Sequence, residues 1–154
     1  MNEAHYHRPD FNGGKSNSET EAQENLAAKI IEARWPGVHA YRFTRFSPVD
    51  WYFTDDQYEH LYAVAEIKCR NHDMQRYETA FLAVNKHRRL IDTAAALDLL
   101  PLFFWRFTDG HLCWVDCREV DASKVKVGGM IRIEYSRGNR EPVIEVPINQ
   151  LKEV

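Results

Sequence analysis

The sequence lacks the features that mark secreted and membrane-spanning proteins. It has only three cysteines, an odd number that does not suit a disulfide framework. Cys113 and Cys117 lie near His111, but the zinc-knuckle spacing and an evident fourth ligand are both missing. The longest apolar runs, such as residues 99–105, are too short to cross a bilayer, and the N-terminus lacks the order of a secretory signal. These absences predict a cytoplasmic protein with reduced thiols and no membrane segment.

Positive charge is also in short supply. The chain has 20 Lys and Arg against 23 Asp and Glu, a formal net charge of -3, which argues against a protein that coats nucleic acid by charge alone. An enzyme with a local basic track stays possible, because an acidic metal site lowers the net count. Gly128-Gly129 is not followed by Lys-Ser or Lys-Thr, and no Gly-x-Ser-x-Gly elbow occurs. P-loop nucleotide binding and serine-hydrolase chemistry are therefore not indicated.

The length of 154 residues and the hydrophobic content of 44% suit a single domain. Residues 1–17 are polar and show no periodicity, which predicts a flexible tail ahead of one domain over residues 18–154. A Ser18-x-x-Glu21 capping box predicts a helix over 19–34. Its apolar residues at helical spacing are Ala22, Leu26, Ile30 and Ala33, with Ala27 and Ile31 beside them.

Most of the remaining chain alternates like strands. Asn85 is a plausible N-cap for a second helix over 86–98, whereas 79–84 fits either a short strand or a first helical turn. The segments expected as strands are 38–46, 49–53, 61–68, 102–107, 111–116, 130–135 and 143–146. This order predicts a mixed α/β fold, in which helices pack on a central mixed sheet and a β-hairpin closes the C-terminal part.

Three charged residues stand out on two neighbouring predicted strands. Asp50 opens one strand, and Glu66 and Lys68 share a face near the end of the next, which is otherwise apolar. Two carboxylates at one place make a hard-oxygen site that suits Mg²⁺, and a nearby ammonium can orient an attacking water. The alternative is structural, with Glu66 and Lys68 as a surface ion pair on an edge strand and Asp50 as a turn residue.

The segment resembles the core of the PD-(D/E)XK phosphodiesterase superfamily, which includes restriction enzymes, Holliday-junction resolvases and phage exonucleases. Asp50 matches the first acid of the motif, although Val49 separates it from Pro48. Glu66 and Lys68 match the second half of the motif. The resemblance therefore implies a restriction-endonuclease-like core.

The resemblance also implies roles for these residues. In that family the first acid and the glutamate bind the metal, here Asp50 and Glu66, together with the carbonyl of Ile67. The lysine, here Lys68, handles the attacking water. The implied activity is Mg²⁺-dependent hydrolysis of DNA by an endonuclease, with Mn²⁺ as a substitute and 5′-phosphate products.

Many members of the family carry a further glutamate on the first helix that points into the site. Glu24 is the candidate here, because it shares a helix face with Ala27, Ala28 and Ile31. Glu21 is the competitor and stays open as an alternative, since it can instead cap the helix.

A group of cationic residues follows the motif in the sequence. A helix start combined with guanidinium groups suits contact with phosphate, and resolvase-type members of the family place a lysine there near the DNA backbone. A solvated helix face is the alternative. The candidates for DNA binding are Lys86, Arg88, Arg89, Arg70 and Arg76.

Two readings compete with a stand-alone nuclease. The fold could serve as a non-catalytic nucleic-acid or protein interaction module with a partly retained site. It could also be a subunit of a larger restriction or repair assembly. A domain of this size has little surface for sequence readout, so specificity would come from homodimerisation or from a partner.

Overall fold

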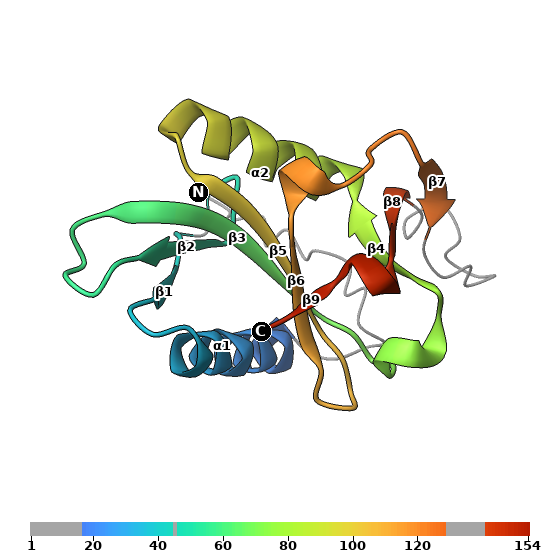
Figure 1. Ribbon diagram of the computed structural model, residues 1–154, viewed down its shortest axis with the longest axis horizontal. Helices are drawn as coiled ribbons and strands as arrows, with labels where there is room; N and C mark the ends of the chain where they lie inside the picture. Colours follow the sequence, from blue (N-terminus) through green and yellow to red (C-terminus); the bar gives the residue numbers. More distant parts are fainter. Residues whose placement is uncertain (1–16, 45, 129–140) are drawn as a thin grey trace, which may run out of the picture.

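The computed structural model describes residues 17–44, 46–128 and 141–154 (Figure 1). The tail expected over 1–17 and the strand expected over 130–135 therefore lie, except for Asn17, outside the described residues. The elements in chain order are α1 (Asn17–Arg34), β1 (His39–Arg42), β2 (Trp51–Thr54), β3 (Leu61–Cys69), η1 (Met74–Arg76), β4 (Thr79–Ala83), α2 (Val84–Leu97), β5 (Leu100–Arg106), β6 (Leu112–Asp116), η2 (Cys117–Glu119), β7 (Val125–Gly128), β8 (Glu141–Pro147), η3 (Ile148–Gln150) and β9 (Lys152–Glu153).

The strands form two sheets. The six-stranded sheet has the order β1-β2-β3-β5-β6-β9, and the three-stranded sheet has the order β4-β8-β7. In the larger sheet β3 and β5 are parallel, while the other neighbours are antiparallel, so the expected mixed sheet is confirmed. The parallel pair is joined by a crossover through β4 and α2, as parallel strands require.

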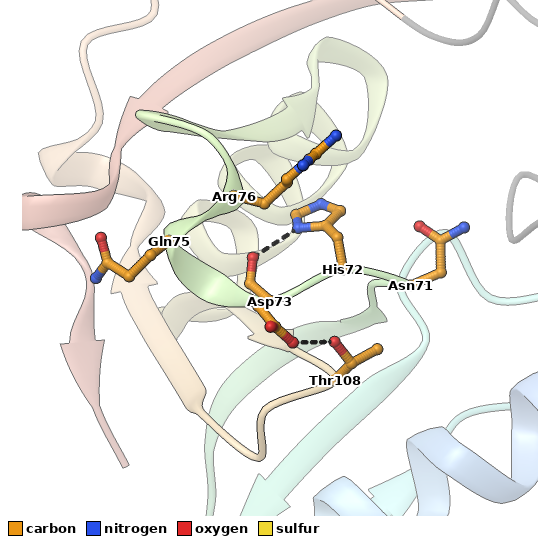
Figure 2. Close-up of a pocket in the computed structure, with 6 residues that line it drawn as sticks. All are labelled: Asn71, His72, Asp73, Gln75, Arg76 and Thr108. Carbon is orange, nitrogen blue, oxygen red and sulfur yellow. Dashed lines mark hydrogen bonds between the residues drawn. The ribbon is translucent and has the colours of Figure 1, made fainter.

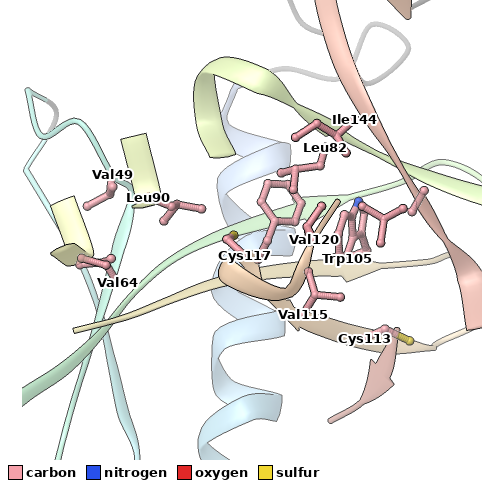
Figure 3. Packing of buried hydrophobic residues seen from close by; sticks show 14 of the residues in the cluster. Val49, Val64, Leu82, Leu90, Trp105, Cys113, Val115, Cys117, Val120 and Ile144 are labelled. Atoms are coloured by element: carbon pink, nitrogen blue, oxygen red, sulfur yellow. The ribbon is translucent and has the colours of Figure 1, made fainter. Parts of the chain in front are cut away.

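The two helices cover opposite faces of the larger sheet (Figure 1). Strand β3 supplies both faces by alternation, with Ala63, Ala65 and Ile67 packed on the α1 side and Val64 on the α2 side. The α1-side cluster has as its large members Ile31, Trp51, Phe53, Phe104 and Leu112. The α2-side cluster, seen in Figure 3, also takes in the smaller sheet, and its members include Val49, Leu82, Leu90, Trp105 and Ile144.

The structure corrects several expectations about the helices. Ser18 already lies inside α1, so it is not the N-cap. The buried face of α1 is centred on Glu24, Ala27, Ala28 and Ile31, whereas Leu26 of the expected stripe is 48% exposed. The small side chains of Ala27 and Ala28 on this face allow the helix to approach the sheet closely. Neither described helix is long and apolar enough to span a bilayer.

The second helix and its surroundings also differ from expectation. Helix α2 begins at Val84 after Ala83, which provides no side-chain cap, so Asn85 is not the N-cap. Residues 79–83 form a true strand because they pair with β8. Strand β7 (Val125–Gly128), also paired with β8, was not expected, since it lacks a clear apolar alternation.

The packing of α2 generates a prediction about stability. Leu90 is 1% exposed in the α2-side cluster, and Leu97 on the same helix is 54% exposed. Leu90→Ala should lower the free energy of unfolding by about 2–5 kcal/mol, because a buried leucine leaves a cavity. Leu97→Ala should change it by less than about 0.5 kcal/mol. Urea denaturation measures both, and equal losses would contradict this assignment of the buried face.

Candidate active site

The register of the sheet brings Asp50 opposite Glu66. Trp51 pairs with Ala65 in the antiparallel β2–β3 ladder, so one further step places Asp50 beside Glu66. The Phe43 N–H donates to the Asp50 carbonyl oxygen at 2.8 Å, which extends the β1–β2 pairing to this residue. Opposite residues of an antiparallel pair share a face of the sheet. The two carboxylates are therefore neighbours on the α2 side.

Glu66 is held in a place that disfavours its charge. Glu66 is only 5% exposed and lies on β3, a strand whose residues are mostly apolar. Burial raises its pKa to about 8, and the negative charge of Asp50 adds to this effect. The positive charge of Lys86 works in the opposite direction. The site thus carries excess negative potential in a desolvated setting.

Lys86 lies between the two acids. Its Nζ is 3.0 Å from Glu66 Oε1 and 3.6 Å from Asp50 Oδ2, and its side chain is 14% exposed. Lys86 comes from the first turn of α2, which packs on this face of the sheet. Contact with the DNA backbone, expected from the sequence, stays a prediction; in the structure this ammonium is engaged with the acid pair.

Lys68 lies two residues beyond Glu66 on the same face of β3. Burial lowers its pKa, and the nearby positive charge of Arg70 lowers it further. The negative charges of Glu66 and Glu24 act to raise it. Lys68 is therefore within electrostatic reach of Glu66 and Glu24. Its environment favours the neutral amine more than water does.

Glu24 lies at the edge of the site rather than within the acid pair. It is 9% exposed, and Arg42 Nη2 donates to its Oε2 at 3.1 Å. Burial raises the pKa of Glu24, Arg42 lowers it, and Asp50 raises it again, so this carboxylate senses the site. Glu21 is exposed to solvent on the same helix. Of the two candidates, Glu24 is the one that the fold turns toward the sheet.

Arg42 is a site residue that the sequence did not single out. Its guanidinium also donates to Asn25 Oδ1 at 3.1 Å and lies 4.5 Å from the centre of the Trp51 ring. The guanidinium pairs with Glu24 by charge, and its stacking on the Trp51 ring holds it in place. The only sequence signal is a positive charge within a β-prone run, and that signal does not distinguish Arg42 from Arg45.

The other predicted DNA-binding residues are in different settings. Arg88 and Arg89 are exposed on α2. Arg70 is half-buried, its Nη2 donates to the Phe81 carbonyl at 2.6 Å, and burial lowers its pKa to about 10. Trp105 Nε1 donates to the same carbonyl at 3.1 Å. Arg70 is thus committed to joining β3 to β4, which weakens its case as a phosphate contact.

Arg76 borders a polar pocket in the loops that follow β3 and β5 (Figure 2). Two of the lining groups bond to each other, since Thr108 Oγ1 donates to Asp73 Oδ1 at 2.5 Å. The His72 Nδ1 lies 2.9 Å from the Asp73 carbonyl oxygen. These bonds fix the shape of the loop. They leave the exposed Arg76 as the cationic group of the lining.

The donor set fits Mg²⁺ rather than a softer metal. Within the described ranges, no group of three or more His, Cys, Asp and Glu is placed to hold a metal ion by itself. Mg²⁺ commonly takes one or two carboxylates and keeps several waters, which Asp50 and Glu66 can satisfy. Asp50 lies next to the buried Glu66, so a cation between the two carboxylates would offset their repulsion when both are charged. Asp50 and Glu66 therefore fit the divalent metal ion that this fold implies.

A mixed sheet between two helices, with two acids and a lysine gathered on adjacent strands, defines the class of PD-(D/E)XK nucleases. Among solved structures the chain is similar to the Holliday junction resolvase Hjc of Archaeoglobus fulgidus, with a TM-score of 0.54 and 11% identity. The match covers 89% of this chain and 90% of that chain. This likeness shows the restriction-endonuclease-like fold.

The model of one protein family matches residues 7–154, nearly the whole sequence. Its description is "Phage putative PDDEXK endonuclease", and the chain belongs to this family. A comparison with curated proteins gave no match. Together the family and the fold identify a nuclease-type phosphodiesterase.

The raised pKa of Glu66 generates a prediction for the metal-free protein. The folded state keeps the Glu66 proton up to about pH 8, whereas the unfolded chain loses it near 4.5. Stability should therefore fall as pH rises through this window. Glu66→Gln, which mimics the protonated group, should flatten this dependence and raise the melting temperature near pH 8 by about 2–4 °C.

Thermal melting in EDTA across this pH range measures the effect. Glu59→Gln, on an exposed turn, is the matched control and should follow the wild-type curve. Parallel curves for wild type and Glu66→Gln would show that Glu66 is not a strained carboxyl in the fold.

Proposed function

We propose that this protein is a Mg²⁺-dependent endonuclease that hydrolyses phosphodiester bonds of DNA in the cytoplasm. The observation that carries the proposal is the meeting of Asp50 and Glu66 on one sheet face, with Lys68 two residues further along the strand. A purely structural ion pair does not need a second acid beside the buried Glu66. Placing a second carboxylate next to a buried one is costly when both are charged and no cation is supplied.

Each residue has a distinct task in this proposal. Asp50, Glu66 and the carbonyl of Ile67 hold the metal, which when bound offsets charge on the scissile phosphate and supplies an activated water. Lys68 orients the attacking water by hydrogen bonding, and its lowered pKa suits proton exchange nearer to neutral pH. Glu24 bonds to Arg42 at the edge and adds negative potential that favours metal entry.

The positive charge around the site supports a nucleic-acid substrate. Arg88 and Arg89 are exposed on the N-terminal half of α2, the helix that also brings Lys86 to the acids. A helix N-terminus and guanidinium groups both favour phosphate oxygens. DNA lying across this end of α2 would bring its backbone to the acid pair. Because the domain is small, we further propose that it works as a homodimer, which light scattering can test.

The catalytic proposal predicts the effect of three substitutions. Asp50→Asn, Glu66→Gln and Lys68→Met should each lower the DNA cleavage rate by about 10²-fold or more, because each removes a group that acts on the transition state. The assay uses supercoiled, linear, single-stranded and four-way-junction DNA with Mg²⁺ or Mn²⁺. Asp56→Asn, on an exposed turn, is the control that should cut like wild type. Cleavage that survives Asp50→Asn or Lys68→Met would refute the assignment.

The proposed phosphate contacts predict a change in salt dependence. The double variant Arg88→Ala/Arg89→Ala should bind DNA more weakly, and the slope of log affinity against log salt should become shallower by roughly 1–2. Binding is measured by fluorescence anisotropy with Ca²⁺ in place of Mg²⁺. Lys29→Ala, on the exposed side of α1, should leave the slope unchanged. An unchanged slope for the double variant would place the DNA elsewhere.

A further inference from the structure

The ammonium of Lys86 is placed where a metal ion would be expected. Its Nζ is 3.0 Å from Glu66 Oε1 and 3.6 Å from Asp50 Oδ2, so it bridges the two carboxylates that the proposed function assigns to the metal. The side chain is 14% exposed, and the Glu66 side chain is 7% exposed. This is a buried bridge between two strands and a helix, not a loose surface ion pair.

We propose that Lys86 is a built-in substitute for the divalent cation, which must displace it in order to bind. The inference rests on the proposed function, because it takes Asp50 and Glu66 as the metal ligands. In the metal-free protein Lys86 balances part of the charge of the acid pair. In the metal-loaded protein the same ammonium becomes available to a substrate phosphate.

Charge and space exclude simultaneous occupancy. A divalent ion bound to Glu66 Oε1 would lie within a few ångströms of the present Lys86 Nζ, and two cations at that distance repel strongly in a desolvated setting. Positive charge is already concentrated here, since Arg70 and Lys86 both act on the neighbouring Lys68. The repulsion drives out Lys86, because its contact with the acids is the one that the metal replaces.

Lys86 has the means to move. Its four-carbon stem is flexible, and its ammonium is a compact charge that can donate hydrogen bonds to any nearby oxygen. It lies in the first turn of α2, where Ala83 provides no side-chain cap to the helix. Leu90 and Ala94, one and two turns further on, hold the rest of the helix in the core. A rotation of one side chain therefore suffices, without movement of the helix.

This exchange couples metal and substrate. Without DNA, the metal competes with an internal cation and binds less tightly than the two carboxylates alone would allow. With DNA, a phosphate oxygen offers the displaced ammonium a new partner, so each ligand should favour the other. Lys86 is thus a positioning residue that lowers the affinity of the site for metal until a substrate phosphate is near.

The first test measures Mn²⁺ affinity in the absence of DNA, by calorimetry or by electron paramagnetic resonance. Lys86→Met keeps the apolar stem and removes the charge, and it should bind Mn²⁺ about 10-fold more tightly than wild type. Lys29→Met makes the same change on α1 and should bind like wild type. Circular dichroism confirms that each variant is folded.

The second test uses the unmodified protein and does not depend on a variant that folds. Lysines are acetylated with an N-hydroxysuccinimide ester, and the extent of modification is read by mass spectrometry. Lys86 should be protected in EDTA and should become about 5-fold or more reactive when Mn²⁺ is added. Lys152, which is exposed, serves as the internal reference.

The outcomes separate the two proposals. If Mn²⁺ binds wild type and is lost in Asp50→Asn, but Lys86→Met binds no more tightly and Lys86 stays protected, the displacement idea is wrong and the nuclease site stands. If neither wild type nor Lys86→Met binds Mn²⁺ at millimolar concentration, the metal site itself is wrong, and the displacement idea falls with it.

Discussion

The half-buried Asp50 and the buried Glu66 lie side by side and repel each other when both are charged, and the surroundings of the site offset that repulsion. Asp50 and Glu66 are forced together by strand register, since the ladder that pairs Trp51 with Ala65 continues by one step. Burial raises the pKa of Glu66 to about 8, so the state in which both carboxylates are charged is unfavourable. Protonation of Glu66 or a nearby cation relieves this repulsion, and Lys86 places an ammonium beside both carboxylates.

The packing of the sheet and the helices explains why the fold tolerates the unfavourable pair of Asp50 and Glu66. The parallel strands β3 and β5 form the centre of the larger sheet, and a helix packs on each face. Lys86 is delivered by α2, whose Leu90 is anchored in the core, and Glu24 is delivered by α1 through close alanine contacts. The functional charges are thus carried on elements that are anchored in the core by their buried apolar residues. The electrostatic cost of placing Glu66 beside Asp50 is offset by the packing of these elements.

Local patterns in the sequence predict much of this framework. The alternation along residues 61–68 gives β3 and places Glu66 and Lys68 on one face, because side chains of a strand alternate with a period of two. The turn at Gly110, with φ of 90°, and the helix end before Gly37 are also local. The main stripe assigned to α1 was wrong, since Ala22, Leu26 and Ala33 are exposed, because helical periodicity does not reveal which side the sheet occupies.

From the sequence, two acids and a lysine at strand spacing, with cationic residues after them, predict a class of chemistry. Only the packed fold shows which charges meet. Lys86 is 20 residues from Glu66 in the chain, yet its Nζ touches that carboxylate, while Arg42 pairs with Glu24 and Arg70 turns to the Phe81 carbonyl. Long flexible cations choose partners by through-space electrostatics after the sheet and helices have packed, and no local pattern records that choice.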